Sequence, residues 1–293
     1  MKKYTLSAGD FVYAMDKNNA PVLQVESGST VEFETCDCFH GQILDSCQTI
    51  ESLDWDRINP ATGPVFVEGA MPGDTLKVTI ENIRLASTGI VGVIPDVGVL
   101  GEEIQSSELA ILEVKDGTVY FDEKRKLPVR PMIGVIGVAP KNEPVSCGTP
   151  GNHGGNMDCT KITTGATLYF PVNTEGALLS MGDVHACMGD GEVMGTGLEI
   201  AANITVQVEV VKEKAPEVPL LLHEGVLYAL ASAPSMEEAA KIAIRVIKEV
   251  VMEQTGLSIA RAGMLLSTVG SLEICQIVDP NVTLRFGIPV KYL

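Results

Sequence analysis

The sequence predicts a mainly β protein, with a sandwich-like or barrel-like core over residues 1–212 and a smaller α+β module over residues 213–293. Three observations support this fold class. Apolar and polar residues alternate with a period of two in several runs of the first part, which is typical of half-buried strands. Gly, Pro and Asp turn signals separate these runs about every 8 to 12 residues. A long helical pattern occurs only in the last part.

The strands of the first part are expected where such runs occur. The alternating runs are rich in β-branched residues, and they occupy residues 30–35, 75–80 and 204–210. Turn signals mark their limits, as at Pro72-Gly73-Asp74, and at Asp116-Gly117 after a shorter strand over residues 111–114. Two almost wholly apolar runs, over residues 132–138 and 166–172, predict more fully buried strands.

Residues 139–160 are expected to form a long loop, because Gly and Asn are too frequent between Gly148 and Asp158 for a regular element. Long loops in compact domains are often functional, and a solvated connection is the alternative. His153 and Asp158 lie among glycines, which would let backbone N–H groups approach a ligand. Both are therefore candidate site residues.

The segment 180–192 carries the most informative side chains. If residues 180–187 are extended, Asp183 and His185 lie two residues apart and share one strand face. Gly189-Asp190-Gly191 predicts a tight turn, which would bring Glu192 back beside them. Two carboxylates and one imidazole are ligand types of a Zn²⁺-like ion, and an open fourth position would make such a site catalytic. The alternative is a charged pair on a solvated strand face.

The C-terminal module is expected to begin near residues 212–219, where charged residues and two prolines mark a boundary. Ser235 and Glu238 form a capping box before an apolar helical stripe, and Gly256 is placed to end that helix. A shorter helix is predicted over residues 258–268. Strands are predicted over residues 220–231, 272–278 and 282–290. No catalytic residue is predicted in this module.

Charge and composition exclude several classes of partner. The net charge is −17, from 21 basic and 38 acidic residues, so phosphate backbones and anionic membrane surfaces would be repelled. Neither nucleic acid nor a membrane is therefore an expected partner. No run approaches the roughly 18 apolar residues of a transmembrane helix, and the N-terminus lacks the apolar stretch of a signal peptide. Seven cysteines without an export signal indicate reduced thiols and a cytoplasmic protein.

Two short units carry weaker candidates. Asp37 and Cys38 follow a predicted strand and precede the turn residue Gly41, a position at which both sites and ordinary polar caps occur. Cys38 is interpreted as a buried thiol. Glu68 follows three apolar residues, so it lies either at the rim of a pocket or in solvent.

Taken together, these segments resemble the acetamidase/formamidase family. The resemblance rests on Gly182-Asp183-Val184-His185 with Met188-Gly189-Asp190-Gly191-Glu192, on the run 150–158, and on turn units within 59–74. It covers most of residues 30–210 and continues more weakly to the end. It implies hydrolysis of short aliphatic amides, such as formamide or acetamide, to ammonia and a carboxylate. It also implies a β-rich core with a smaller α/β part, assembled as a homo-oligomer (dimer or higher).

Our interpretation is a metal-assisted amidase. A divalent ion, Zn²⁺ or alternatively Ca²⁺ or Mn²⁺, would polarise the amide carbonyl and lower the pKa of bound water. Asp183, His185 and Glu192 are the expected ligands, with Asp37 as an addition. Glu68 is the first candidate for carrying the proton to the leaving nitrogen.

The Gly-rich run is expected to supply the rest of the site. Asp158 is the second candidate for carrying the proton, and His153 is a candidate substrate contact. Backbone N–H groups around Gly154 and Gly155 would hold the oxyanion, and Asn156 would orient the amide.

Two alternatives stay open. Cys187 lies two residues after His185, and Cys159 follows Asp158, so either thiol could serve as the nucleophile of a metal-independent amidase with His185 as base. A non-catalytic β scaffold that binds Ca²⁺ structurally also fits the acidic composition and the many Asp-Gly turns.

Overall fold

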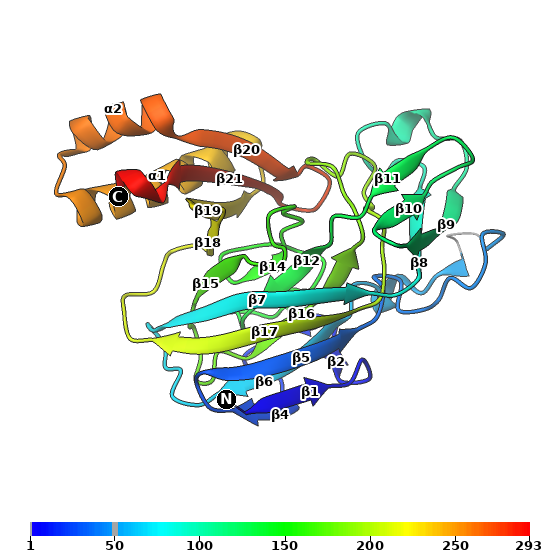
Figure 1. Cartoon of the computed structure of the whole chain (residues 1–293), viewed down its shortest axis with the longest axis horizontal. Coiled ribbons are helices and arrows are strands. Elements are labelled where there is room, and N and C mark those ends of the chain that lie inside the picture. Colours follow the sequence, from blue (N-terminus) through cyan, green and yellow to red (C-terminus); the bar gives the residue numbers. More distant parts are fainter. Residues whose placement is uncertain (1, 49–51) are drawn as a thin grey trace.

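The computed structural model describes residues 2–48 and 52–293 and confirms a mainly β fold with helices near the C-terminus (Figure 1). Its largest sheet has nine strands, in the order β1-β5-β17-β7-β15-β18-β19-β21-β20. The bounds of these strands are β1 Lys3–Leu6, β5 Ser29–Thr35, β17 Ala202–Val211, β7 Thr75–Leu85, β15 Thr167–Pro171, β18 Leu220–His223, β19 Val226–Ala233, β21 Val282–Pro289 and β20 Ser271–Gln276.

A second sheet has six strands, in the order β14-β12-β16-β6-β2, with β4 paired to β6. Their bounds are β14 Gly154–Asn156, β12 Met132–Gly137, β16 Leu179–His185, β6 Ala61–Val67, β2 Phe11–Val12 and β4 Leu23–Val25. A four-stranded sheet, in the order β11-β10-β9-β8, projects to one side (Figure 1). The remaining elements are β8 Thr88–Val93, β9 Glu108–Lys115, β10 Thr118–Tyr120, β11 Lys126–Pro128, the pair β3 Ala14–Met15 and β13 Val145–Ser146, and the short 3₁₀ helices η2 Trp55–Arg57, η3 Gly101–Glu103 and η4 Val290–Tyr292.

The main core lies between the two large sheets. Residues of β5 alternate between buried and half-buried positions, as the period-two pattern predicted. Phe33 and the inward residues of β7 and β17 belong to the same apolar cluster as Ile133 of β12 and Met181 of β16. The structure is therefore a sandwich in this region, and β16 is fully buried within it.

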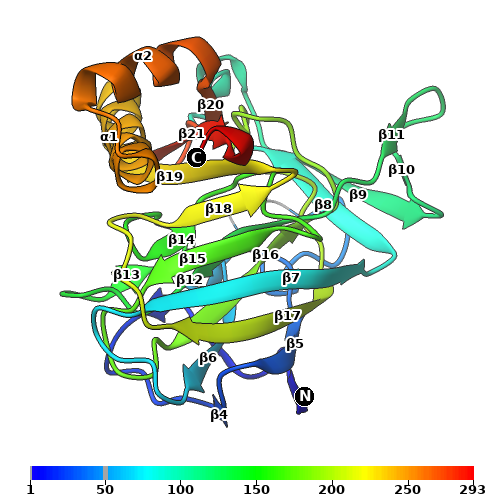
Figure 2. The same cartoon turned by 60° about the vertical axis from the view of Figure 1, so that its left-hand side comes forward.

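Helix α1 (Met236–Thr255) follows its predicted limits closely. The Ser235 side chain accepts a hydrogen bond from the Glu238 N–H, and Gly256 ends the helix with φ 68°. The apolar stripe of α1 packs on β19 and β21, and α2 (Ile259–Val269) lies beside it (Figure 2). None of the helices in the described ranges is long and apolar enough to cross a membrane.

Two segments differ from the prediction. Residues 220–231, predicted as one strand, form the hairpin β18–β19, because Glu224 (φ 49°) and Gly225 (φ 75°) make a tight turn within the apolar run. The predicted loop 139–160 contains two short strands, and β14 pairs with β12 through its glycines. The proposed boundary near residue 212 falls between β17 and β18, and the nine-stranded sheet continues across it.

Candidate active site

Strand β16 places the first two predicted ligands in the centre of the six-stranded sheet. It pairs with β12 on one side and β6 on the other, so Asp183 and His185 are both buried. Asp183 has φ 53°, a left-handed conformation that non-Gly residues rarely adopt. Its Oδ1 lies 3.6 Å from His185 Nε2. The two side chains therefore converge, as expected from their spacing.

A ring of carboxylates surrounds the Nε2 atom of His185. Glu199 Oε2 lies 3.1 Å away, Asp183 Oδ1 3.6 Å, Asp158 Oδ1 3.9 Å and Glu192 Oε1 4.0 Å. All five side chains are buried. The structure thus brings together three of the four predicted ligands with Asp158, the second candidate proton carrier.

The local backbone explains how distant segments reach this ring. Glu192 follows the predicted Gly189-to-Gly191 turn, and its N–H donates to the Gly189 carbonyl. The backbones of Glu192 (φ 46°) and Asp158 (φ 40°) both adopt the left-handed conformation, which persists only where the surrounding structure enforces it. Glu199 and Ile90 exchange two backbone hydrogen bonds, which fix Glu199 beside β8.

Glycines leave the space that the ring occupies. A Cβ at Gly134 would lie 2.4 Å from Asp158 Oδ1 and 2.6 Å from Asp183 Oδ2. A Cβ at Gly197 would lie 2.4 Å from His185 Nδ1. Both positions therefore admit only glycine without displacement of the ring.

Burial and mutual repulsion change the acidity of the ring. Burial raises the pKa of Glu192 to about 8 and that of Glu199 to about 7, and neighbouring carboxylates add to both shifts. The pKa of Asp158 is raised well above its usual value for the same two reasons. Burial alone would lower the pKa of His185, but Glu199 and Asp183 raise it well above its usual value.

The ring has the properties of a cation site. Among residues 2–48 and 52–293, both oxygens of Asp158, Oε2 of Glu199 and both ring nitrogens of His185 have no hydrogen-bond partner. Buried polar groups normally have partners, and clustered carboxylates repel unless a positive charge lies among them. The ligand atoms form two groups, with one atom from each of three residues and all three atoms within 4.8 Å of one another. The groups are Asp158, His185 and Glu192, and Cys38, Asp183 and Glu199.

A cavity of about 460 Å³ leads to the ring. Asp183, Glu192 and Glu199 line it, together with Asn156, whose Oδ1 has no hydrogen-bond partner in the described part of the chain. Tyr13 also lines the cavity. A small molecule in this cavity would meet both the carboxylates and a polar side-chain amide.

Three other predicted residues lie away from the ring. The carboxylate of Asp37 accepts a hydrogen bond from the Gly41 N–H (3.2 Å) and belongs to neither group of possible ligands. Glu68 is exposed at the end of β6, where Gln24 Nε2 donates to its Oε1 (3.0 Å). His153 is buried and lines a separate cavity of about 780 Å³.

The predicted backbone donors also lie outside the cavity. The Gly154 N–H donates to the Gly151 carbonyl within a turn, so it is already occupied. Neither Gly154 nor Gly155 lines the cavity with Asn156. Both have positive φ angles (99° and 86°), and neither leaves room for a Cβ: at Gly154 it would lie 2.3 Å from the Ile136 carbonyl oxygen of β12, and at Gly155 2.5 Å from that of Thr149.

Sequence reasoning did not identify Glu199, Cys38 and Asp279 as site residues. Glu199 stands between apolar residues in Leu198-Glu199-Ile200, and a carboxylate in a buried apolar run is a signal of function. The sequence alone predicts only a buried thiol at Cys38. Asp279 is supplied by the C-terminal part, where it is half-buried, lines the cavity and has its pKa raised by desolvation and then by Asp158.

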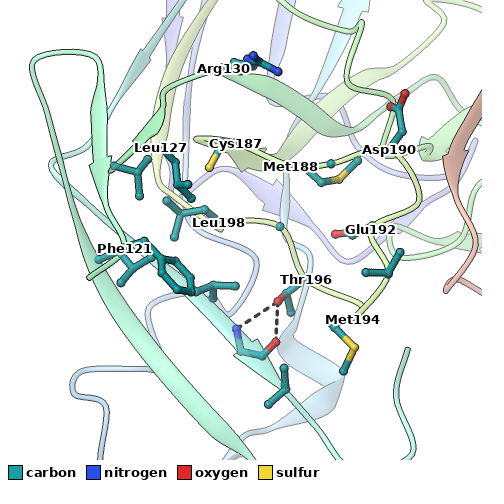
Figure 3. Close-up of a pocket in the computed structure, with 18 of the residues that line it drawn as sticks. Phe121, Leu127, Arg130, Cys187, Met188, Asp190, Glu192, Met194, Thr196 and Leu198 are labelled. Atoms are coloured by element: carbon teal, nitrogen blue, oxygen red, sulfur yellow. Dashed lines mark hydrogen bonds between the residues drawn. The ribbon is translucent and has the colours of Figure 1, made fainter. Parts of the chain in front are cut away.

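A second, mostly apolar cavity of about 550 Å³ lies on the other side of Glu192 (Figure 3). Cys187 and Leu198 line it, and Leu127 of β11 and Phe121, which follows β10, face it. Thr196 Oγ1 bonds to the Gly92 backbone at 2.9 and 3.2 Å and fixes the wall between the two cavities. Cys187 therefore opens to the apolar cavity, whereas Glu192 contributes to both.

Comparison with known proteins identifies one family. The model of the acetamidase/formamidase family matches residues 16–146 and 144–292. A predicted acetamidase/formamidase from Thermoanaerobacter tengcongensis is 46% identical, with a TM-score of 0.96 over 98% of this chain and 96% of that chain. An acetamidase from Bacillus halodurans is 43% identical, with a TM-score of 0.97 over 98% of each chain.

More distant relatives match over part of their length. A formamidase from Methylophilus methylotrophus is 25% identical over 66% of this chain and 62% of its own length. The chain spans 61% to 63% of the length of the curated relatives that it matches. The family model nevertheless covers nearly the whole sequence, and two solved structures match it from end to end. The chain belongs to the acetamidase/formamidase family.

Proposed function

We propose that this protein hydrolyses short aliphatic amides, such as formamide or acetamide, to ammonia and a carboxylate, with a divalent metal ion bound by the ring around His185. The observation that supports this most is the set of buried carboxylates within 4.0 Å of His185 Nε2. Names of relatives add support, because the similar proteins include a formamidase and an acetamidase, the latter with the same fold.

His185 and the surrounding carboxylates are the residues that would hold the ion. Asp183, His185 and Glu192 are the expected ligands, and Glu199 joins them because of its 3.1 Å approach to His185. Oxygen and imidazole donors suit Zn²⁺ and also Mn²⁺, and a Cys38 thiolate would favour Zn²⁺. A bound divalent ion would polarise the carbonyl and lower the pKa of attacking water.

Asp158 is our candidate for the proton carrier, because both of its oxygens lack partners in the described residues and it lies against His185. It would take a proton from water and pass it to the leaving nitrogen, since ammonia leaves readily only when protonated. Asn156 would orient the amide within the cavity. Glu68 is exposed and distant in the fold, so Asp158 takes this role in the proposal.

Asp158→Asn separates two roles for this residue. If Asp158 carries the proton, the variant should keep its Zn²⁺ affinity while kcat falls about 100-fold or more, in line with general acid–base catalysis. If Asp158 is a metal ligand, the variant should lose Zn²⁺ affinity instead. Equilibrium dialysis with Zn²⁺ and single-substrate kinetics give both numbers from one preparation.

The cysteine alternative receives less support. Burial raises the pKa of Cys187, so little thiolate forms at neutral pH, and its side chain opens to the apolar cavity. Burial alone would raise the pKa of Cys159, but a hydrogen bond with Cys275 and the charge of Arg285 lower it to about 7. The Cys159 thiol is nevertheless engaged with Cys275 and Arg285, whereas both oxygens of Asp158 lack partners in the described residues and lie toward His185.

The central experiment is ammonia release from formamide and acetamide before and after removal of metal with a chelator, followed by addition of Zn²⁺, Mn²⁺ or Ca²⁺. Activity that disappears and then returns with metal supports the proposal. Activity that is indifferent to metal would refute the metal mechanism and leave the cysteines. Metal binding without ammonia release from any amide would favour the non-catalytic scaffold. The expected homo-oligomer is tested on the same samples by light scattering.

A further inference from the structure

Arg285 is a fully buried cation in the C-terminal part of the chain, only 1% exposed. It lies on β21, and its Nε donates to Glu273 Oε2 on the neighbouring β20 (2.7 Å). Its Nη1 and Nη2 donate to the two oxygens of Asp190 at 3.1 and 2.5 Å. This two-point contact fixes both the position and the orientation of the Asp190 carboxylate.

Asp190 belongs to the turn that presents Glu192 to the ring. The backbone of this turn is also attached to β20, because the Gly191 N–H donates to the Cys275 carbonyl (2.7 Å) and the Ile277 N–H donates to the Gly191 carbonyl (3.2 Å). The turn therefore runs as a short parallel extension beside the end of β20. The side chain of Arg285 and the backbone of β20 therefore hold this turn, and both belong to the C-terminal module.

The segment that carries Asp158 meets the same ion pair. Thr160 Oγ1 donates to Asp190 Oδ1 at 2.7 Å. Arg285 Nη1 lies 3.8 Å from the Sγ atom of Cys159. The two residues that follow Asp158 are thus both tied to Arg285, directly or through Asp190.

The ring needs such an external restraint. Its carboxylates repel one another before a cation binds. Glu192 and Asp158 also hold left-handed backbone angles of 46° and 40°, which persist only where neighbouring contacts enforce them. Arg285 does not line the cavity, so its influence on the ring passes through Asp190 and the segments attached to it.

We infer that Arg285 is a positioning residue: by binding Asp190 it holds Glu192 and Asp158 in the arrangement that receives a divalent cation. The inference rests on the proposed function for the identity of the ligand. It gives the C-terminal module a part in metal binding that the sequence did not indicate.

Arg285→Met is the test variant, because it keeps an unbranched side chain and removes the guanidinium. The Asp190 and Glu273 side chains are 44% and 31% exposed, so water can solvate them in the variant and the fold is retained. We expect Zn²⁺ affinity, measured by equilibrium dialysis of metal-free protein, to fall about 10- to 100-fold, the usual effect of removing the support of a metal ligand. Arg285→Lys restores the charge without the two-point contact, so its affinity should lie between the two.

Lys77→Met is the control for the loss of an ion pair. It breaks the Lys77–Glu209 pair (2.6 Å) between β7 and β17 of the nine-stranded sheet. The Glu209 side chain (36% exposed) is about as accessible as those of Asp190 and Glu273, whereas the Lys77 side chain (31%) is more exposed than that of Arg285 (2%). This variant should keep wild-type Zn²⁺ affinity and metal-dependent activity. A general effect of losing an ion pair would lower the affinity in both variants.

Asp190→Asn tests the route of the effect. Because Arg285 acts through Asp190, the double variant with Arg285→Met should lose little more affinity than either single variant. Fully additive losses would mean that the two residues act separately and would contradict the inference.

The outcomes distinguish this inference from the proposed function. A folded Arg285→Met protein with wild-type Zn²⁺ affinity overturns the inference and leaves the metal mechanism standing. A wild-type protein that binds no divalent ion overturns the metal mechanism and the cation-receiving role with it. Amide hydrogen exchange then still tests whether Arg285 restrains the ring segments. The exchange rate at residues 158–160 and 189–195 should rise in Arg285→Met but not in Lys77→Met.

Discussion

Single residues determine the space available to the ring. Gly134 on β12 faces Asp158 and Asp183, and even one methyl group there would overlap both carboxylates. Gly134→Ala should therefore displace the ring and destabilise the protein by about 1 to 3 kcal/mol, as overpacking of a core usually does. Chemical denaturation measures the free energy of unfolding, and dialysis should show weaker Zn²⁺ binding in the same variant.

Gly263→Ala is the control for this change. Gly263 lies within α2, and a Cβ there would meet nothing within 4 Å. Alanine at an open helical position should stabilise the protein by about 0.5 to 1 kcal/mol and leave Zn²⁺ binding intact. Equal stability losses at the two glycines would show that steric overlap with the carboxylates is not the cause.

His153 makes folding sensitive to acid. Burial lowers its pKa from 6.5 to about 4 in the folded protein. Between these two pH values only the unfolded chain binds the proton, so the free energy of unfolding falls as the pH falls through this window. The difference corresponds to roughly 3 kcal/mol. His153→Gln should flatten the curve of stability against pH between 6.5 and 4, as measured by urea denaturation.

His223 provides the comparison. Burial also lowers its pKa, but the residue is only partly buried beside the turn of the β18–β19 hairpin. His223→Gln should change the pH dependence much less than His153→Gln. An unaltered curve in His153→Gln would show that its imidazole is solvated in the folded protein.

The predicted site residues fall into two kinds. Asp183, His185 and Glu192 were recognisable because one strand and one turn place them within ten residues, and local geometry suffices to bring them together. Asp158 joins them through the Gly-rich segment. Glu199 reaches them through its pairing with Ile90, more than a hundred residues away, which no local pattern reveals. Asp37 and Glu68 lie outside the ring. Asp37 accepts a hydrogen bond within its own turn, and Glu68 accepts one from Gln24 at the end of β6.

Among the secondary-structure elements, α1 offers a test that leaves the ring untouched. The hydroxyl of Ser235 accepts a hydrogen bond from the Glu238 N–H at the start of this helix. Ser235→Ala removes that acceptor and should lower stability by about 1 kcal/mol. Thermal unfolding measures the loss, and ammonia release below the transition should be unchanged. A variant as stable as the wild type would mean that water replaces the cap without penalty.

The elements with strong periodicity were predictable, and those defined by tertiary pairing were not. The alternating runs became β5, β7 and β17, and the helix limits at Ser235 and Gly256 were recognised from their capping chemistry. The β18–β19 turn was missed because Glu224-Gly225 interrupts an otherwise apolar run without a proline or a second glycine. Strand β14 was missed because its glycines are stabilised by β12 rather than by their own β propensity.

For the whole molecule, removal of metal should lower stability as well as activity. In the proposed metal site, the buried carboxylates would repel one another without the ion, and the folded protein would bind the ion far better than the unfolded chain. Zn²⁺ at 100 times its dissociation constant should raise the free energy of unfolding by about 2.7 kcal/mol. Calorimetry of chelated and reloaded protein measures this, with His185→Ala as the variant that should not respond. A melting temperature independent of Zn²⁺ would contradict the cation site.

The attachment of the Glu192 turn to β20 and β21 has a consequence for the transfer of this site between proteins. The residues around His185 Nε2 all precede residue 200, whereas Arg285 and the backbone groups of Cys275 and Ile277 that bond to Gly191 lie beyond residue 212. The nine-stranded sheet also runs across this boundary. A graft of residues 1–212 onto another protein would therefore carry the carboxylates without the contacts that hold their turn, so we do not expect the site to be portable as an N-terminal unit.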